Sequence, residues 1–230
     1  MNEGATSERV AQILLVDDHP VFRQGLRELI HREPGWHVCG EAADADEAAR
    51  LVQETKPDLV IVDILLGATN GIDLIKTLNA SNADLPMLVV SMYDESLYAE
   101  RAVRAGAMGY VMKHESPKTF KAAIHRVLAG EMYLSQKMGA TLVAKLMRGG
   151  EETEGSPLDS LSDRELEVFR MLGQGKGTRQ IAKELNLSVA TINSFRARIK
   201  EKLQLKNSME LLLKAIHWVK EQEGNPLSRG

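Results

Sequence analysis

The sequence predicts a two-part protein, in which an α/β domain with a five-stranded, doubly wound parallel sheet precedes an all-α domain of four helices. Short apolar runs alternate with amphipathic stretches through the first 130 residues, which is typical of a parallel sheet covered by helices. From residue 161 onward only helical patterns follow. The net charge also changes sign, from −7 over residues 1–158 (16 Lys and Arg, 23 Asp and Glu) to +4 over residues 159–222 (12 against 8). We therefore expect different partners for the two parts.

The first domain is expected over residues 9–130. Its strands are predicted from five apolar runs, at 12–16, 37–42, 58–63, 86–91 and 109–112. Helices are predicted between them from three- and four-residue apolar spacing, at 21–32, 45–55, 71–80, 96–105 and 116–129. Residues 131–158 are expected to be a linker, with a helix at 135–147 followed by the stretch RGGEETEGSPLD, whose composition is typical of a flexible segment.

The second domain is expected over residues 159–222 as four helices. Ser162 and Glu165 have the spacing of a capping box for the first helix. Thr178, Ser188 and Ser208 are expected to cap the other three. A short helix, a turn of about four residues and a longer basic helix make a helix-turn-helix pattern.

Composition excludes several classes of protein. Cys39 is the only cysteine, so an intramolecular disulfide and a zinc ribbon are both excluded, and we expect Cys39 to be a small core residue. The N-terminal residues have no apolar stretch of signal-peptide length, and no later run approaches the ~18 apolar residues of a membrane span. We expect a cytoplasmic protein with no membrane partner.

Three carboxylates follow apolar runs of the predicted sheet. Asp17 and Asp18 follow the first run and Asp63 ends the third, and the first and third strands can be neighbours. Such a group is a hard oxygen site suited to Mg²⁺. The fourth run ends in Ser91 and the fifth is followed by Lys113. A metal, an acidic nucleophile, a hydroxyl and an ammonium together suit phosphoryl transfer to a carboxylate.

The motifs LLVDDHP, VIVDI, LVVSMYD and GYVMKHES resemble, in order and spacing, the receiver domain of two-component response regulators, which has a flavodoxin-like fold. The resemblance implies that Asp63 is the phosphoacceptor for a sensor histidine kinase. It also implies that Asp17 and Asp18 bind Mg²⁺, that Ser91 and Lys113 hold the phosphoryl oxygens, and that Tyr110 changes rotamer with Ser91.

The loop after Asp63 departs from the family pattern. Gly67 and Ala68 stand where a Pro-Gly turn is frequent. Leu65 would give the metal its backbone carbonyl, but its apolar side chain cannot orient a water. We therefore expect slow self-dephosphorylation.

The third helix of the second domain presents two faces at about 100° per residue. Ile192, Phe195, Ile199 and Leu203 share a core face, and small and polar residues lie opposite between basic flanks, as in a helix that enters a major groove. The expected contacts with double-stranded promoter DNA are Asn193, Ser194, Arg196, Ala197, Arg198 and Lys200, with Thr178 and Arg179 from the preceding helix.

The stretch LSDRELEVFRMLGQGKGTRQIAKELNLSVATINSFRARIKEKL resembles the LuxR-type helix-turn-helix. A receiver followed by this module is the architecture of the NarL/FixJ response regulators. Asn193 stands where Lys is frequent and can pair with adenine; Phe195 stands where His or Tyr is usual. In the last helix, Leu212, Leu213 and Ile216 either pack on the domain core or form a homodimer interface, and both alternatives stay open.

The expected function is a transcription factor controlled by phosphorylation, in which Asp63 modification shifts dimerisation and DNA binding. A second hypothesis is a Mg²⁺-dependent phosphatase with an aspartyl-phosphate intermediate, which Leu65 disfavours because such enzymes usually carry an acid at that position. A third hypothesis is an interaction module that acts without phosphate, which Asp17, Asp18, Asp63 and Lys113 argue against.

Overall fold

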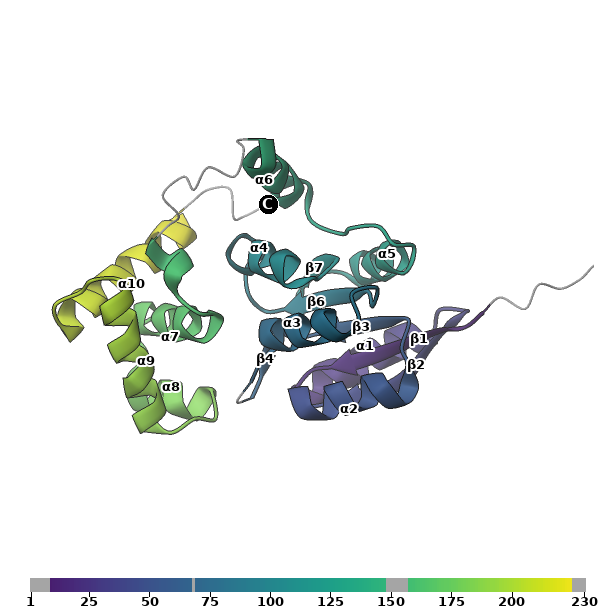
Figure 1. Cartoon of the computed structure of the whole chain (residues 1–230), viewed down its shortest axis with the longest axis horizontal. Helices are drawn as coiled ribbons and strands as arrows, with labels where there is room; N and C mark the ends of the chain where they lie inside the picture. The colour runs from purple at the N-terminus through teal and green to yellow at the C-terminus, as the bar shows by residue number, and fades with distance from the viewer. Residues whose placement is uncertain (1–8, 68, 148–156, 225–230) are drawn as a thin grey trace, which may run out of the picture. The chain divides into compact units, whose positions relative to one another are not determined.

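The computed structural model describes residues 9–67, 69–147 and 157–224. The chain divides into two compact units between residues 149 and 150, and each unit is described by itself (Figure 1). Most of the predicted linker stretch RGGEETEGSPLD lies outside the described residues. Within the described residues, no helix combines the length and the apolar character needed to cross a bilayer.

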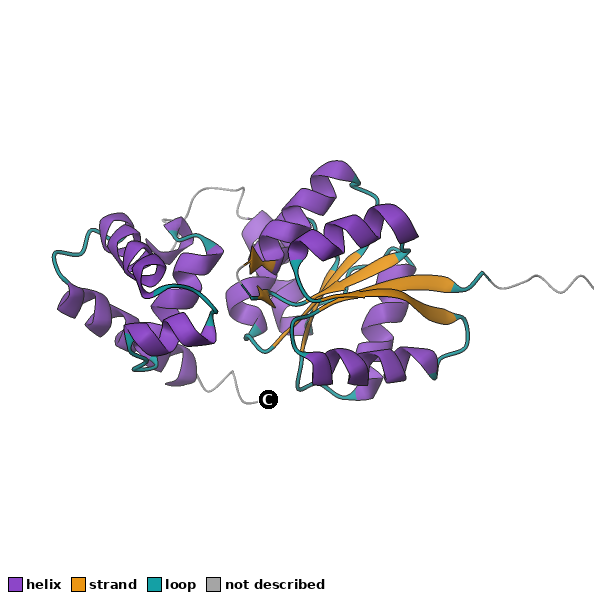
Figure 2. Cartoon of the chain, turned by 90° about the horizontal axis from the view of Figure 1, so that it is seen from below, coloured by secondary structure: helices purple, strands orange, loops and turns teal. Residues whose placement is uncertain are grey.

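The N-terminal unit confirms the predicted parallel sheet, and each predicted strand and helix is found within one residue of its expected bounds. Five strands pair in the order β2-β1-β3-β6-β7, all parallel (Figure 1). Figure 2 shows helices on both faces of this sheet. The strands are β1 (Ala11–Val16), β2 (Trp36–Ala42), β3 (Leu59–Val62), β6 (Met87–Ser91) and β7 (Gly109–Met112). The helices are α1 (Pro20–His31), α2 (Ala45–Thr55), α3 (Gly71–Ser81), α4 (Glu95–Ala105), α5 (Pro117–Leu128) and α6 (Gln136–Met147).

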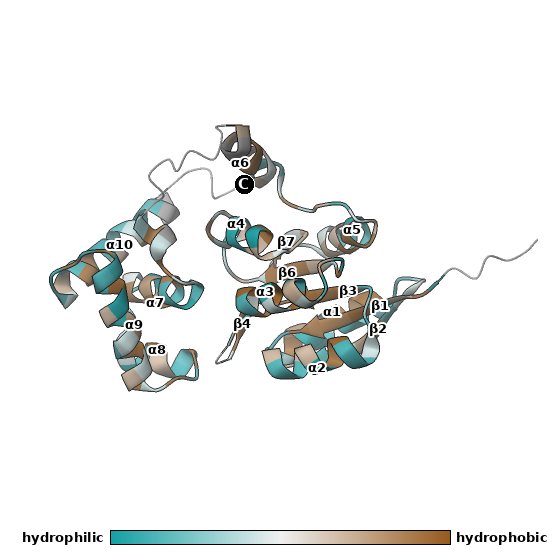
Figure 3. Cartoon of the chain, in the orientation of Figure 1, coloured by the Kyte–Doolittle hydropathy of each residue, from teal (hydrophilic) through white to brown (hydrophobic). Residues whose placement is uncertain are grey.

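Both faces of β1, β3, β6 and β7 are largely buried, which explains why these strands are mostly apolar (Figure 3). The edge strand β2 is more open and also carries His37 and Glu41. One core cluster joins alternate strand residues, such as Ile13, Leu15 and Val90, to side chains of α1 and α5. The intervening residues, such as Leu14 and Val60, are also buried and point to the opposite face. Full burial of each such side chain contributes about 1.5–3 kcal/mol, so the two layers hold the strand ends in place.

A short antiparallel hairpin after β3 was not predicted. It pairs β4 (Leu65–Leu66) with β5 (Thr69–Asn70), and two-residue strands carry too little periodicity to be detected in the sequence. Gly71 follows directly and begins α3. A Cβ there would lie 1.9 Å from the backbone oxygen of Asp63, so only glycine lets the hairpin return this close to the end of β3.

The C-terminal unit is all helical, as predicted. Its elements are η1 (Pro157–Ser160), α7 (Asp163–Gly173), α8 (Thr178–Glu184), α9 (Val189–Lys202) and α10 (Ser208–Gly224). Phe169 of α7 and Trp218 of α10 pack with their ring centroids 5.7 Å apart. Gly173 lets the two helices approach closely, since a Cβ there would lie 2.3 Å from the backbone oxygen of Ala215.

Two of the four predicted caps of these helices are confirmed and two are wrong. Ser162 forms the capping box with Glu165, and Ser188 accepts a hydrogen bond from the Thr191 amide. Thr178 is instead the first residue of α8, after Gly177, and its hydroxyl accepts a hydrogen bond from α9. For α10, the Asn207 side chain, one residue before Ser208, accepts from the amides of residues 209 and 210. Asn is at least as good a helix N-cap as Ser, so the sequence alone could not decide whether Asn207 or Ser208 caps α10.

Candidate functional site

The carboxyl edge of the sheet brings three acids together. Val16 pairs with Val62 across β1 and β3, and the amide of Asp63 donates to the Val16 oxygen at 2.8 Å. Asp17 and Asp63, which follow these strands directly, are therefore neighbours, and both are at most 5% exposed. Asp18 follows Asp17 and is more open, with 31% of its side chain exposed.

Lys113 neutralises part of this charge. Its Nζ lies 2.6 Å from Asp63 Oδ2 and 2.7 Å from Asp17 Oδ2, and its side chain is only 4% exposed. The Lys113 ammonium also lies 4.6 Å from the ring centroid of Phe22, a cation–π contact. The backbone amide of Lys113 donates to the backbone oxygen of Ser91 at 2.7 Å, which ties the lysine to the end of β6. One cation thus holds two carboxylates.

The charge on Asp63 is nevertheless poorly compensated. Burial raises its pKa to about 6; Lys113 lowers the pKa, Asp17 raises it, and the backbone N–H of Leu65 lowers it. Asp63 Oδ1 is buried and has no hydrogen bond of good geometry among the described residues. A buried anion with one uncommitted oxygen, beside two other acids, is suited to receive a cation or to act as a nucleophile.

The chemistry of these donors fits Mg²⁺. Ligand atoms of Asp17, Asp18, His19 and Asp63 all lie within 4.8 Å of one another. Carboxylate oxygens are the ligands that Mg²⁺ prefers, and the exposed side of Asp18 leaves room for waters. Leu65 lies in β4 with a half-buried side chain, two residues after Asp63.

The loop after β3 also contacts the acids. The amide of Gly67 donates to Asp18 Oδ2 at 3.0 Å. A proline, which is frequent at this position in receivers, has no N–H to make this bond. The glycine at position 67, in place of a proline, therefore allows an additional hydrogen bond to Asp18 in this chain.

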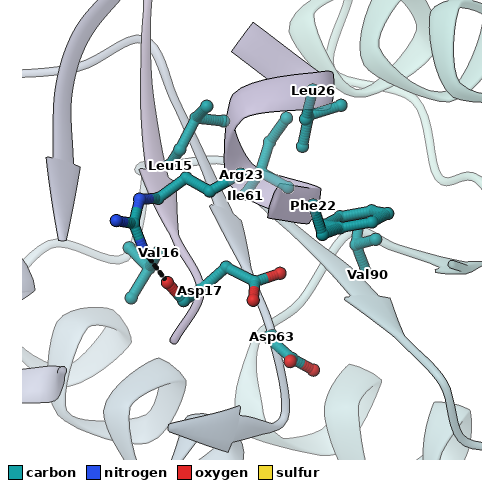
Figure 4. Close-up of a pocket in the computed structure, with 9 residues that line it drawn as sticks. All are labelled: Leu15, Val16, Asp17, Phe22, Arg23, Leu26, Ile61, Asp63 and Val90. Atoms are coloured by element: carbon teal, nitrogen blue, oxygen red, sulfur yellow. Dashed lines mark hydrogen bonds between the residues drawn. The ribbon is translucent and has the colours of Figure 1, made fainter. Parts of the chain in front are cut away.

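Sequence reasoning missed two residues at this edge. His19 Nδ1 lies 2.7 Å from Asp18 Oδ1, and a histidine directly after two aspartates was a signal that could have been used. Arg23 donates to the backbone oxygen of Asp17 at 2.5 Å and to Glu41 at 2.9 Å. Figure 4 shows Arg23 reaching the backbone oxygen of Asp17 beside a small pocket, which is lined by apolar side chains such as Phe22 and also by Asp17 and Asp63. The hydrogen bond from Arg23 to Glu41 joins α1 to β2, and nothing in the sequence indicated it.

Ser91 and Tyr110 lie on the neighbouring strands β6 and β7 and are both buried. Ser91 Oγ accepts from the Tyr93 amide at 3.3 Å, and the Tyr110 hydroxyl donates to the Tyr93 oxygen at 2.8 Å. Burial raises the Tyr110 pKa well above its ordinary value, and the nearby Ser91 hydroxyl lowers it. The two side chains are thus linked through one residue of the loop that leads into α4.

The predicted DNA-contact residues lie in the separate C-terminal unit. On α9, Ile192 and Ile199 are fully buried and Phe195 is half-buried. Arg196 and Lys200 are half-buried, and Arg196 donates to the Thr178 hydroxyl at 2.6 Å, which joins α9 to α8. The exposed members of the predicted set are Asn193, Ser194, Ala197, Arg198 and, on α8, Arg179.

The last helix divides its apolar residues between the core and the surface. Leu211 and Val219 are buried in the domain core. Leu212 and Ile216 are half-buried, whereas Leu213 is 59% exposed. Leu213 is therefore the predicted dimer residue that is most available to a second copy.

Comparisons with known proteins agree with this architecture. The family model of the response regulator receiver domain matches residues 13–125, and that of the bacterial regulatory proteins of the luxR family matches residues 159–215. The response regulator GacA of Pseudomonas aeruginosa is 32% identical over 205 residues, which are 89% of this chain and 95% of GacA. The nitrate/nitrite response regulator protein NarL of Escherichia coli strain K12 is 29% identical over 217 residues, 94% of this chain and 98% of NarL.

Solved structures give the same result. A two-component response regulator of the LuxR family from Aurantimonas sp. SI85-9A1 is 39% identical, covers 60% of this chain and 99% of its own, and has a TM-score of 0.56. RcsB from Salmonella enterica serovar Typhimurium, bound to promoter rprA in the presence of the phosphomimetic BeF3⁻, is 25% identical, covers 88% of this chain and 96% of its own, and has a TM-score of 0.56.

A receiver sheet with an acidic edge, followed by a LuxR-type helix-turn-helix module, defines a DNA-binding regulator of a two-component system. The chain belongs to the NarL/FixJ family of response regulators, which confirms the resemblance found in the sequence. Members of this family are generally phosphoacceptors rather than enzymes, and they pair with sensor kinases.

Proposed function

We propose that Asp63 is the residue phosphorylated by a sensor histidine kinase, and that its modification shifts dimerisation and promoter binding of this cytoplasmic regulator. The observation that carries the proposal is the buried Asp63 itself. Its Oδ2 is 2.6 Å from Lys113, and its Oδ1 has no hydrogen bond of good geometry among the described residues. The third acid at the edge and the raised pKa indicate a group that is stabilised by incoming positive charge.

Asp17, Asp18, Asp63 and the backbone carbonyl of Leu65 would hold Mg²⁺. The bound ion would supply positive charge for the oxygens of the transferred phosphoryl group. These ligands are proposed from the donor set and from their proximity.

The protein groups would divide the reaction among them. An Asp63 carboxylate oxygen forms a bond to phosphorus, and the bond between phosphorus and the donor imidazole nitrogen of the kinase breaks, so the imidazole leaves. Lys113 would hold a phosphoryl oxygen with its ammonium, and Ser91 would donate its hydroxyl to another. This would draw Ser91 away from Tyr93, and Tyr110 would rearrange with the same loop. The change is a population shift between two states.

The C-terminal unit would bind double-stranded promoter DNA as a homodimer. The relative RcsB is bound to a promoter in the presence of a phosphomimetic, which supports promoter binding by this chain in its phosphorylated state. Arg198, Arg179 and Lys200 would contact phosphates, and Asn193, Ser194 and Ala197 would face base edges. Arg196 donates a hydrogen bond to Thr178, so both residues lie at the junction of α8 and α9. We propose that this junction also faces the DNA.

The decisive experiment compares DNA affinity and oligomeric state with and without BeF3⁻ in Mg²⁺ buffer. Wild type should gain affinity and dimerise with BeF3⁻, and Asp63→Asn should not respond. Binding-site selection with the BeF3⁻-treated protein supplies the DNA. Equal affinity and equal oligomeric state of wild type in the two conditions would contradict the proposed switch.

Two residue proposals have tests of their own. Asn193 would pair with adenine at about 1–3 kcal/mol of discrimination, so Asn193→Ala should relax the selected sequence at one position. An unchanged preference would exclude the contact. Leu65 would make self-dephosphorylation slow, with lifetimes of minutes or longer, and Leu65→Asn should shorten the aspartyl-phosphate lifetime. An unchanged lifetime would remove the basis for this role.

A further inference from the structure

We propose that His19 is a nitrogen ligand of the acidic site and makes this site prefer first-row transition-metal ions over Mg²⁺. The proposal rests on the proposed metal site and adds a ligand that determines its selectivity. His19 Nδ1 lies 2.7 Å from Asp18 Oδ1, 3.3 Å from Asp17 Oδ1 and 3.8 Å from Asp63 Oδ2. Ligand atoms about 2.1 Å from one ion lie roughly 3–4 Å from each other, so the spacings to Asp17 and Asp63 fit one coordination sphere. The 2.7 Å contact with Asp18 is an ion-pair distance and would lengthen slightly when both atoms bind an ion.

A second observation points to a ligand at the same place. Asp63 is 3% exposed, and its Oδ1 is buried without a hydrogen bond of good geometry among the described residues. The three carboxylates meet one histidine ring nitrogen within 4.8 Å. An acidic cluster that merely faced solvent would leave its oxygens exposed to water instead.

The backbone holds His19 in this position. Its amide donates to Asp17 Oδ1 at 2.8 Å, so the residue is tied to one of the acids. Pro20 is the first residue of α1 and restricts the backbone of His19 to the extended region, where it is found (φ −94°, ψ 100°). The side chain is 57% exposed, but its point of attachment is fixed from both sides.

Asp18 is oriented for the same sphere. The Gly67 amide donates to Asp18 Oδ2, and Asp18 Oδ1 is the oxygen that faces His19. The loop after β3 therefore occupies one carboxylate oxygen and leaves the other for an ion. Hydrogen bonds that orient ligands in this way commonly change metal affinity by about 10–100-fold.

Ligand chemistry determines the direction of the preference. Mg²⁺ is hard, binds oxygen and keeps several waters, so an imidazole adds little to its binding. For N/O sites, affinity rises from Mn²⁺ through Co²⁺ to Ni²⁺ and Cu²⁺, and imidazole suits the later ions. A three-oxygen, one-nitrogen set should hold Ni²⁺ more tightly than Mg²⁺.

The test measures metal binding directly in the tag-free full-length protein. Ni²⁺ and Mg²⁺ affinities are compared by calorimetry for wild type, His19→Ala and the matched control His37→Ala. His37 is exposed on β2 and stacks on His31 at 6.0 Å, so it represents an adventitious surface site. His19→Ala should weaken Ni²⁺ binding at least tenfold more than Mg²⁺ binding, and His37→Ala should not change this ratio. Circular dichroism confirms that each variant is folded.

Pulsed paramagnetic resonance on bound Mn²⁺ provides a spectroscopic signature. Wild type should show modulation from a coordinated nitrogen, which should vanish in His19→Ala and persist in His37→Ala. An unchanged Ni²⁺ to Mg²⁺ ratio in His19→Ala, persistent nitrogen modulation, or a loss confined to His37→Ala would each overturn the proposal.

The design separates this inference from the proposed function. If Mg²⁺ binds and supports phosphorylation while His19→Ala leaves selectivity unchanged, only the role of His19 fails. If wild type binds neither ion in a manner sensitive to Asp63→Asn, the metal site fails, and the role of His19 fails with it.

Discussion

Two buried carboxylates of this protein, Asp63 and Glu165, have pKa values that are shifted in opposite directions. Asp63, at the edge of the receiver sheet, shares Lys113 with Asp17, and burial raises its pKa to about 6. Glu165, at the start of α7, is 2% exposed, yet its pKa is lowered. Burial alone would raise the Glu165 pKa, but hydrogen bonds from Lys202 and from the Ser162 backbone outweigh that effect.

The difference separates a reactive group from a structural one. Glu165 completes a capping box and receives an ammonium: its Oε2 accepts hydrogen bonds from both the Ser162 amide and Lys202, so its charge serves the fold. Asp63 has an oxygen that nothing in the described fold satisfies well, and a neighbouring acid that repels it. The ionised form of Asp63 therefore destabilises the receiver until a cation binds or the carboxylate is neutralised. The charge of Glu165, in contrast, is already compensated by its hydrogen bonds within the C-terminal unit.

The largest expected effect comes from removing the shared lysine. Lys113→Met should destabilise the N-terminal unit by about 3 kcal/mol at pH 7.5 in chelator, because two buried carboxylates lose their cation. The cost should shrink at pH 5, where one acid takes up a proton. Urea unfolding read from Trp36 in a Trp218→Phe background isolates this unit, since the chain has two tryptophans.

Lys121→Met is the matched control for this prediction. Lys121 pairs with Glu33, but 37% of its side chain is exposed. A surface pair contributes at most about 1 kcal/mol. Equal costs for the two lysine variants would mean that the acidic edge is not strained.

The second prediction removes the penalised charge. Asp63→Asn should stabilise the N-terminal unit by about 1–3 kcal/mol at pH 7.5 in chelator. A folded pKa near 6, above the unfolded value of 3.8, means that wild type loses stability as pH rises through this window. The gain of the variant should therefore be small at pH 4 and grow toward pH 7.

Asp73→Asn, an exposed acid on α3, should show no comparable pH-dependent gain. The prediction is contradicted if the free energy of unfolding of wild type, relative to that of Asp63→Asn, does not fall between pH 4 and 7. The ionised Asp63 would then not destabilise the N-terminal unit. Added Mg²⁺ should reverse the order of stability, because only wild type keeps all three acidic ligands.

These contrasts were only partly predictable from the sequence. Asp17 and Asp63 could be placed together because each follows an apolar strand and β1 and β3 were expected to be neighbours. The sharing of Lys113 between both acids depends on side-chain packing from β7 across β6 to β3 and β1, which no local pattern encodes. The Gly67 amide on Asp18 depends on a hairpin of two-residue strands that is too short to show periodicity.

The C-terminal unit shows the same limit. Ser162 and Glu165 carry a local capping signal and behaved as predicted. Thr178 carries a similar local signal, but its hydroxyl is taken by Arg196, 18 residues later in the chain. A tertiary contact of this kind overrides local preference and becomes visible only when α8 and α9 are packed together.

The third prediction removes the charge of the structural carboxylate. Glu165→Gln should destabilise the C-terminal unit by about 1–2 kcal/mol at pH 7, because a charged hydrogen-bond acceptor is lost. The lowered folded pKa means that the wild-type advantage is present above the unfolded value of 4.5 and disappears as pH falls through the folded pKa. This sign is opposite to that of Asp63. Unfolding is read from Trp218 in a Trp36→Phe background, and a variant cost that is equal at pH 3 and pH 7 would exclude a charge effect.

The smallest expected effect is that of Lys202→Met, at or below about 1 kcal/mol. The Lys202 side chain is 38% exposed, so water replaces its contact when it is removed, and Glu165 keeps the capping box. A double-mutant cycle with Glu165→Gln should give a coupling of about 0.5–1 kcal/mol. The equivalent cycle of Lys113→Met with Asp63→Asn should give a coupling severalfold larger, because both of those groups are buried. Equal couplings in the two cycles would contradict the distinction between a strained reactive edge and a satisfied helix cap.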